Sequence, residues 1–392
     1  TASMSGGRIA VAAPAASIAA IRATDVVGVT ATAAIARRRG ADGRAAIGRI
    51  AGRRIANAGA AAASAVAATA ALGSTLLSPQ VFAQSQAEAQ VNALEGLAGP
   101  QPGSRRSGAK GICASGHFIG NAAGRELSRA SVFKGDKIPV VARFSVGGGS
   151  PKASDKGKTV RGLALQFQLP GGEQWQMANI SAPVFFVSKP EQFAPFVQAR
   201  TADPATGKAD PEKIKAFSAA NPDTTRQGAY LAQAPVPASY GAVNYWGVNA
   251  FEFEAAPGKS RFARWQFVPE AGVLGLTEDQ LKSMGDEFLA PELRERVAKA
   301  PVSFDFRLQL AEAGDNLTDP TLVWPEARTV VSAGKLVIDK VADGMGGTCD
   351  AMTFNPLVLP AGIKPSADPV LNARAAPYAI SLGRRLGEAA KK

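Results

Sequence analysis

The chain has 392 residues, of which 46% are hydrophobic and 19% charged, a balance typical of a globular protein with a sizeable core. Its single histidine, His117, argues against a histidine-based catalytic triad or a multi-histidine metal site. The net charge of +12 is concentrated at the start, because residues 1–54 hold nine arginines against two aspartates. No basic stripe with interleaved aromatics follows, so we expect no nucleic-acid partner.

Residues 1–54 are rich in alanine, glycine and arginine, and residues 1–52 contain no aromatic residue. Such a segment cannot bury enough apolar surface to fold alone, so we predict a disordered basic tail. A targeting extension, or translation from a start site too far upstream, would give the same composition.

Residues 55–84 are predicted to be a signal peptide. Arg53 and Arg54 precede an uncharged, alanine-rich apolar run, and Val81 and Ala83 supply small residues for cleavage before Gln84. We therefore expect a periplasmic or otherwise exported protein. An uncleaved membrane anchor and an ordinary alanine-rich helix are the alternatives, and only the anchor would bring the protein to a membrane.

From residue 85 to 392 the composition is that of one folded domain. Runs of β-branched and aromatic residues, punctuated by Gly and Pro, predict strands at 138–146, 161–169, 183–188, 248–255, 260–268 and 302–312. Helical patterns occupy 190–200, 211–220 and 290–300. We predict an α+β fold, a large antiparallel β-barrel with surrounding helices.

The two cysteines, Cys113 and Cys349, have no zinc-binding spacing. Export would allow a disulfide between them, but we favour two free buried thiols.

The segment ARAAPY at 373–378 places Arg374 one helical turn from Tyr378. A neighbouring cation favours the phenolate form of a tyrosine, and phenolate is an iron ligand. On its own the pattern fits an ordinary helix face equally well.

Several segments, in order, resemble the catalase family, especially the short catalase-related haem peroxidases of bacteria. They are RRSGAKG (105–111), VARFSVGGG (141–149), RGLALQF (161–167), APVFFVSKPEQF (182–193), DPTLVWPE (319–326), FNPLVLPAGIKPSADPVLNARAAPY (354–378) and RRLGE (384–388). The 354–378 run is the most specific of these.

The resemblance implies that haem, expected to be of b type, is ligated by Tyr378. Arg374 would then hydrogen-bond the phenolate, and Asp368 would hold Arg374 in place. It also implies that Arg105, Arg143 and Arg385 pair with the haem propionates, because the guanidinium fork suits carboxylates.

On the distal side the sequence departs from the family. The family's His-Ala-Lys-Gly motif reads Gly108-Ala109-Lys110-Gly111 here, so the histidine that moves the peroxide proton is replaced by glycine. We expect extended backbone at Gly108. Ser145 matches the serine that orients that histidine, and Phe193 is expected to line the pocket. The position of the family's distal asparagine is Ser181 here, so Asn179, two residues earlier, is the candidate for that role. His117 is predicted to be a packing or surface residue.

The sequence thus predicts a haem-dependent peroxidase that reduces hydrogen peroxide or an organic hydroperoxide with an unknown small-molecule reductant. A haem-binding protein with lost or strongly reduced activity is the alternative, and a haem-free assembly protein is a third. The resemblance leaves a homo-oligomer open.

Overall fold

The computed structural model describes residues 79–344 and 347–391. The predicted basic tail and nearly all of the predicted signal or anchor segment lie outside these residues. Within the described part of the chain, no helix combines the length and apolar character needed to cross a membrane.

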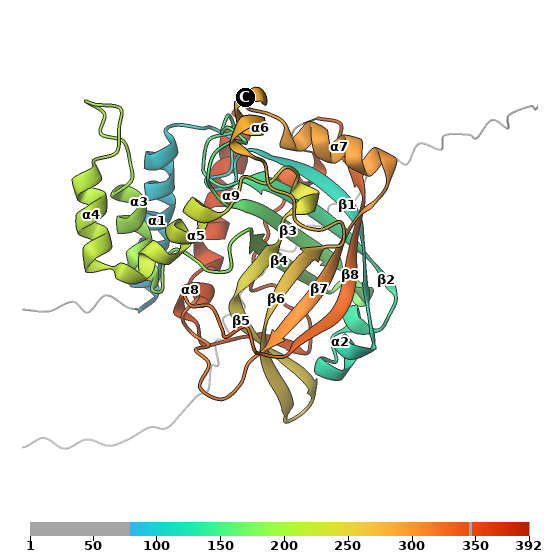
Figure 1. Ribbon diagram of the computed structural model, residues 1–392. Coiled ribbons are helices and arrows are strands. Elements are labelled where there is room, and N and C mark those ends of the chain that lie inside the picture. Colours follow the sequence, from blue (N-terminus) through green and yellow to red (C-terminus); the bar gives the residue numbers. More distant parts are fainter. Residues whose placement is uncertain (1–78, 345–346, 392) are drawn as a thin grey trace, which may run out of the picture. The chain divides into compact units, whose positions relative to one another are not determined.

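The described residues contain nine strands, joined antiparallel into one sheet (Figure 1). They are β1 (Gly111–Gly120), β2 (Lys137–Val146), β3 (Arg161–Gln168), β4 (Gln174–Ile180), β5 (Tyr245–Ala256), β6 (Lys259–Pro269), β7 (Val302–Leu310), β8 (Val330–Val341) and β9 (Ile363–Pro365).

The first eight strands close into a barrel. Their order is β4-β3-β2-β1-β8-β7-β6-β5, and the pairing of Ile180 with Trp246 joins β4 to β5. The short β9 also pairs with β5, on the edge opposite β6. The predicted α+β fold with an antiparallel barrel is confirmed.

Large aromatic side chains fill the barrel interior. Phe118 meets Phe167 and Phe306 edge-on at ring-centroid distances of 5.4 and 5.5 Å, and Trp175 stacks on Phe167 at 5.2 Å. All four side chains are fully buried, so the lumen is a packed core. Because side chains alternate along a strand, every second residue faces the outside of the barrel, where a site can form.

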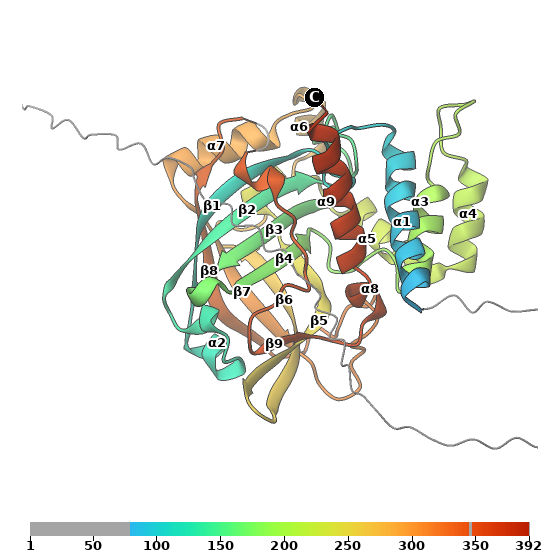
Figure 2. The same cartoon turned by 180° about the vertical axis from the view of Figure 1, so that it is seen from behind.

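Helices cover one side of the barrel and its ends (Figures 1 and 2). They are α1 (Pro79–Ala98), α2 (Ala122–Leu127), α3 (Phe193–Gln198), α4 (Pro211–Ala220), α5 (Arg226–Gln233), α6 (Glu278–Ser283), α7 (Leu289–Lys299), α8 (Pro369–Asn372) and α9 (Ala375–Ala389). In both views α9 runs between the barrel and α1, while α3 and α4 lie beyond α1.

The predicted helices at 211–220 and 290–300 correspond to α4 and α7. Asp210 caps α4 by accepting hydrogen bonds from the amides of Glu212 and Lys213, which explains why that helix begins where the sequence indicates. The predicted helix at 190–200 is present as a short 3-10 turn that continues into α3.

The predicted strand at 183–188 is wrong. This segment is a loop, and the amide of Phe185 donates to the carbonyl of Pro320 rather than to a sheet neighbour. Its apolar residues are partly buried for a different reason, since Phe185 and Phe186 line a cavity. Three strands that were not predicted, β4, β8 and β9, also appear, and β1 begins three residues after Gly108, in the segment expected to be extended.

The prediction of free thiols is also wrong, because Cys113 and Cys349 form a disulfide. Cys113 lies on β1, and Cys349 lies on a 3-10 turn, η6 (Thr348–Ala351). The barrel brings these residues to a Cα–Cα distance of 5.6 Å, although 236 positions separate them in the sequence.

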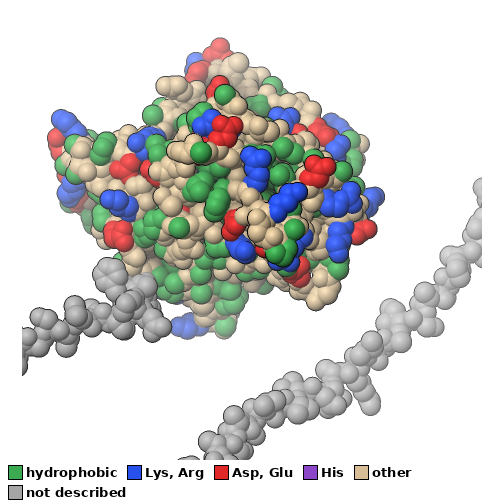
Figure 3. All heavy atoms as spheres, turned by 90° about the horizontal axis from the view of Figure 1, so that it is seen from below, with side chains coloured by type: hydrophobic (Ala, Val, Ile, Leu, Met, Phe, Trp, Pro, Cys, Tyr) green, Lys and Arg blue, Asp and Glu red, His purple; other side chains and the backbone are tan. Residues whose placement is uncertain are grey.

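Figure 3 shows the face of the molecule seen from below. Lys and Arg side chains are interspersed there with Asp and Glu, and hydrophobic side chains lie between them. That face carries no continuous basic stripe.

Candidate haem site

A cavity of about 330 Å³ lies against the outer wall of the barrel. The outward-facing residues of β2, β3 and β4 form one wall, and α1 and α9 contribute to the others. Eight of the nine predicted site residues line this cavity, namely Arg105, Arg143, Ser145, Asn179, Phe193, Arg374, Tyr378 and Arg385. The structure therefore gathers nearly all of the predicted set in one place.

Tyr378 and Arg374 are neighbours, as the helical spacing predicts. Arg374 is the N-cap residue of α9, and its Nη2 donates a hydrogen bond to the phenol oxygen of Tyr378, which lies in the first turn. The guanidinium carbon also lies 5.3 Å from the centroid of the tyrosine ring. The phenol is thus held in the cavity beside a permanent positive charge.

Asp368 reaches Arg374 only through Asn249. Its Oδ1 caps α8 by accepting from the amides of Val370 and Leu371, and its Oδ2 accepts from Asn249 Nδ2 at 2.7 Å. Asn249 Oδ1 in turn lies 3.4 Å from Arg374 Nη1, at the long end of hydrogen bonding. Asp368, which is predicted to hold Arg374 in place, is therefore linked to it through a chain of three residues. Burial raises the pKa of Asp368.

Asn249 was missed by the sequence analysis. It lies on β5, more than a hundred residues from Arg374, and no local pattern marks it.

Arg105, Arg143 and Arg385 converge on one side of the cavity. Arg105 Nη2 donates to the carbonyls of Cys349 and Met352 at 2.8 Å each, and Arg385 Nη2 donates to the carbonyl of Met352 at 2.9 Å. Arg143 donates to the carbonyls of Gly108 and Ala109 at 2.7 and 3.1 Å. Backbone carbonyls on two loops thus fix the orientation of all three guanidinium groups.

Each of these three arginines has a donor atom that makes no hydrogen bond. The Nε atoms of Arg105, Arg143 and Arg385 are buried and make no hydrogen bond. Burial, with the charges of Arg143 and Arg385, lowers the pKa of Arg105 to about 9, and burial also lowers the pKa values of Arg143 and Arg385. The nearest carboxylate, Asp350, is half exposed and 3.5 Å from Arg143 Nε. The cluster is therefore under-neutralised and suits an anionic ligand with more than one carboxylate.

Gly108 and Ser145 are adjacent, as predicted. A Cβ atom placed on Gly108 would lie 3.0 Å from Ser145 Oγ. The backbone at Gly108 is not extended, however, because its φ is +62° and the residue precedes β1. That expectation is wrong: the residue lies in a loop in the left-handed conformation that glycine adopts most readily.

Gly162 is a second glycine that this side of the cavity requires. It pairs with Ser145 across β2 and β3, and a Cβ there would approach Ser145 Oγ to 2.5 Å. A side chain at Gly162 would push the serine hydroxyl from the position that it occupies here. The sequence analysis did not single it out.

Asn179 does not direct its amide toward Gly108. It is the strand partner of the inward-facing Leu163, and its Nδ2 donates to the Leu163 carbonyl at 2.9 Å. Its Oδ1 accepts from Trp265 Nε1 at 2.7 Å. Both amide atoms therefore form hydrogen bonds with barrel residues, and Asn179 also contributes to the cavity wall.

Aromatic side chains close the cavity opposite the barrel. Phe193 lies 5.1 Å from Phe186 between ring centroids, and Phe186 lies 4.4 Å from Phe185. All three line the cavity together with Val91 and Leu94 of α1. The wall is therefore largely apolar and suits a flat hydrophobic ligand.

The described lining of the cavity contains no Asp, Glu, His or Lys side chain. Its ionisable groups are the phenol of Tyr378 and the guanidinium groups of arginines. His117 lies elsewhere on β1 and pairs with Asp339 of β8 at 3.4 Å. No group suited to general-base catalysis is thus present among these residues.

Comparisons with known proteins agree with this arrangement. The family model for catalase matches residues 98–392. A catalase-related peroxidase from Synechococcus elongatus is 42% identical over 295 residues, which cover 75% of this chain and 87% of that protein. One from Mycolicibacterium paratuberculosis is 33% identical over 298 residues, covering 76% and 94%. The chain belongs to the catalase family.

A solved structure shares the fold at lower identity. A fungal catalase superposes with a TM-score of 0.67 at 23% identity, over 72% of this chain and 59% of its own. The chain thus spans less than two thirds of that catalase and most of the two shorter catalase-related peroxidases.

Proposed function

We propose that this catalase-family chain binds haem in the cavity and is a haem-dependent peroxidase. The observation that carries the proposal is the convergence of Tyr378 with three arginines whose buried Nε atoms have no hydrogen-bond partner. A phenol beside a cation is an iron ligand, and the arginines suit the two carboxylates at the edge of a haem. The apolar walls suit the porphyrin.

Each residue then has a defined task. Tyr378 would hold the iron, Arg374 would donate a hydrogen bond to the ligand oxygen, and Arg105, Arg143 and Arg385 would bind the propionates. When bound, haem supplies an iron centre that exchanges electrons with a peroxide. The haem would not be attached through thioether links, because both cysteines are used in the disulfide, and we expect it to be of b type.

This site has no strong base that could accept the proton of the peroxide among its described lining residues. Gly108 has no side chain, and Ser145 offers a hydroxyl, which is a weak base. We therefore propose slow reduction of hydrogen peroxide or an organic hydroperoxide, with a small-molecule reductant returning the electrons. A haem-binding protein with little peroxidase activity is the second candidate, favoured by the lack of a base among the described lining residues.

We further propose export, with the mature protein beginning near Gln84. The disulfide supports this proposal, because such bonds form and persist mainly in oxidising compartments.

An absorption spectrum of the purified protein, with its haem-to-protein ratio, tests the central proposal. We expect about one haem per chain and slow peroxide consumption. A chain that neither retains haem nor takes up added haemin would refute it. A fully loaded chain that consumes no peroxide would favour the second candidate.

A further inference from the structure

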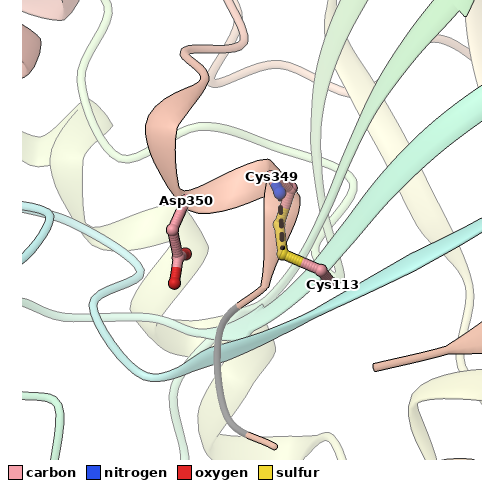
Figure 4. A group of neighbouring side chains, drawn as sticks. All are labelled: Cys113, Cys349 and Asp350. Atoms are coloured by element: carbon pink, nitrogen blue, oxygen red, sulfur yellow. Dashed lines mark hydrogen bonds between the residues drawn. A yellow bond between two sulfur atoms is a disulfide. The ribbon is translucent and has the colours of Figure 1, made fainter. Parts of the chain in front are cut away.

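The Cys113–Cys349 disulfide lies directly behind the arginine cluster. Cys113 is the strand partner of Arg143 across β1 and β2, so the bond is anchored next to one of the three arginines. Its other end is on η6, where the amide of Cys349 also donates to Cys113 Sγ at 3.1 Å (Figure 4). The bond thus ties η6 to the barrel wall.

The tied segment supplies the acceptors for the other two arginines. The carbonyls of Cys349 and Met352 accept from Arg105, and the Met352 carbonyl also accepts from Arg385. Asp350, next to Cys349, gives Arg143 its nearest carboxylate, at 3.5 Å. Residues 349–352 therefore contact all three arginines.

Three like charges close together repel one another, and burial strengthens that repulsion. They stay aligned only if their acceptors are fixed, because each guanidinium otherwise gains by moving toward water. The carbonyls that fix Arg105 and Arg385, and the carboxylate nearest to Arg143, come from a single 3-10 turn and the residues around it. A turn of this length has little stability of its own. The covalent bond to β1 is what holds this turn against the barrel.

We propose that the Cys113–Cys349 disulfide and Asp350 position the three arginines and thereby set how tightly the cavity retains haem. This inference rests on the proposed function. Cys113, Cys349 and Asp350 are positioning residues, since none of them lines the cavity.

The same three residues form a group that could hold a metal ion, with ligand atoms within 4.8 Å of one another. The disulfide argues against that use, because bonded sulfurs are not thiolates. Arg143, beside Asp350, adds a positive charge that disfavours a cation.

The test measures haem dissociation from the holoprotein by transfer to an excess of an apo-globin, followed by absorbance. In the double variant Cys113→Ser/Cys349→Ser we expect dissociation to be at least ~10-fold faster than in the original, a change of about 1.4 kcal/mol. Asp350→Asn, at a half-exposed position that should fold normally, should show a smaller increase in the same direction.

Phe253→Leu is the matched control. Phe253 is a buried residue of the barrel core that does not line the cavity. The substitution Phe253→Leu should lower the melting temperature while leaving the haem dissociation rate unchanged. If the control releases haem as fast as the double variant, general instability explains the effect and the inference is overturned. Unchanged dissociation in both the double variant and Asp350→Asn would also overturn it, as would two titratable thiols in the original protein.

A second readout does not depend on haem. Hydrogen exchange on the haem-free chain should show reduced protection at residues 105–109 in the double variant, because Arg105 loses its fixed acceptors. Equal protection there would overturn the positioning role. A chain that never binds haem, yet shows this loss of protection, would refute the proposed function and the effect on haem retention while leaving the positioning role intact.

Discussion

Arg374 donates a hydrogen bond to the phenol oxygen of Tyr378, one helical turn further along α9. The pair occupies the start of the helix, where Asn249 on β5 links Arg374 to the buried carboxylate of Asp368. Because residues from both the barrel and the C-terminal helix hold the guanidinium, the phenol has a fixed orientation in the cavity before any ligand binds.

Tyr378→Phe should lose most of its haem on purification, because the ring remains but the ligand oxygen is gone. The variant should still fold, since no buried group is left charged and unpaired. Haem content per chain and the melting temperature check these two outcomes. Tyr230→Phe on α5, outside the cavity, makes the same chemical change and should keep full haem content. Full occupancy in Tyr378→Phe would disprove the assignment of the ligand.

The sequence predicts those features of this site that depend on residues close together in the chain. The spacing of Arg374 and Tyr378 on a helix predicts their contact, and the family motifs locate Arg105, Arg143 and Arg385. Asn249 and the disulfide could not be predicted in this way, because they depend on which strands the barrel brings together. The residue pattern of β1 does not itself mark a strand, for a related reason. Its sequence GICASGHFIG contains several small residues, and only the neighbouring strands β2 and β8 make it a strand.

Asn179 shows a different limit. A one-residue change along a strand moves a side chain from the outer wall of the barrel to its interior. The sequence alone does not show which face of β4 Asn179 occupies, and the register with Leu163 directs its amide toward Trp265. Such a choice of face is set by the packing of the whole sheet.

Glu388 on α9 should contribute stability that disappears in acid. Hydrogen bonding from the buried Arg106 holds the pKa of Glu388 below its ordinary value of 4.5. A lowered pKa in the folded state means that the contribution is complete above about pH 4.5 and is lost as the pH falls through the folded-state value. Glu388→Gln should therefore reduce the free energy of unfolding by about 1 kcal/mol at neutral pH.

Urea unfolding of the original and of Glu388→Gln between pH 3 and pH 7 would test this. The difference between the two should be constant near neutrality and should shrink at the acid end. A difference that does not change with pH would show that the carboxylate charge is not the source of the stability.

The mature protein should begin near Gln84 when the full chain is produced in a host that exports it. The uncharged apolar run before Gln84 and the disulfide in the folded domain both support this expectation. Cleavage there would keep Gln90, Val91 and Leu94 of α1, which line the cavity. N-terminal mass analysis of periplasmic protein would reveal the start. Recovery of the uncut chain from the cytoplasm alone would contradict export.

Gly108→His should speed the reaction with hydrogen peroxide. The imidazole would enter a cavity whose described lining has no general base, next to the hydroxyl of Ser145. General acid–base catalysis typically contributes ~10²–10⁴-fold, so we expect a gain of ~10² in the rate of peroxide consumption per haem. The structure adds a cost, since a side chain at a φ of +62° strains the backbone by about 1–2 kcal/mol. The variant should therefore be faster and less stable than the original.

Gly108→Ala separates these two effects, because it carries the same backbone strain without an imidazole. Its melting temperature should fall about as far as that of Gly108→His, while its rate should remain that of the original. The rates are compared at equal haem content, measured from the absorption spectrum. If the rate of peroxide consumption rises as much in Gly108→Ala as in Gly108→His, the increase comes from the altered loop and not from the imidazole. If the original already consumes peroxide as fast as Gly108→His, another group moves the proton. The inference that glycine at position 108 slows proton transfer would then be wrong.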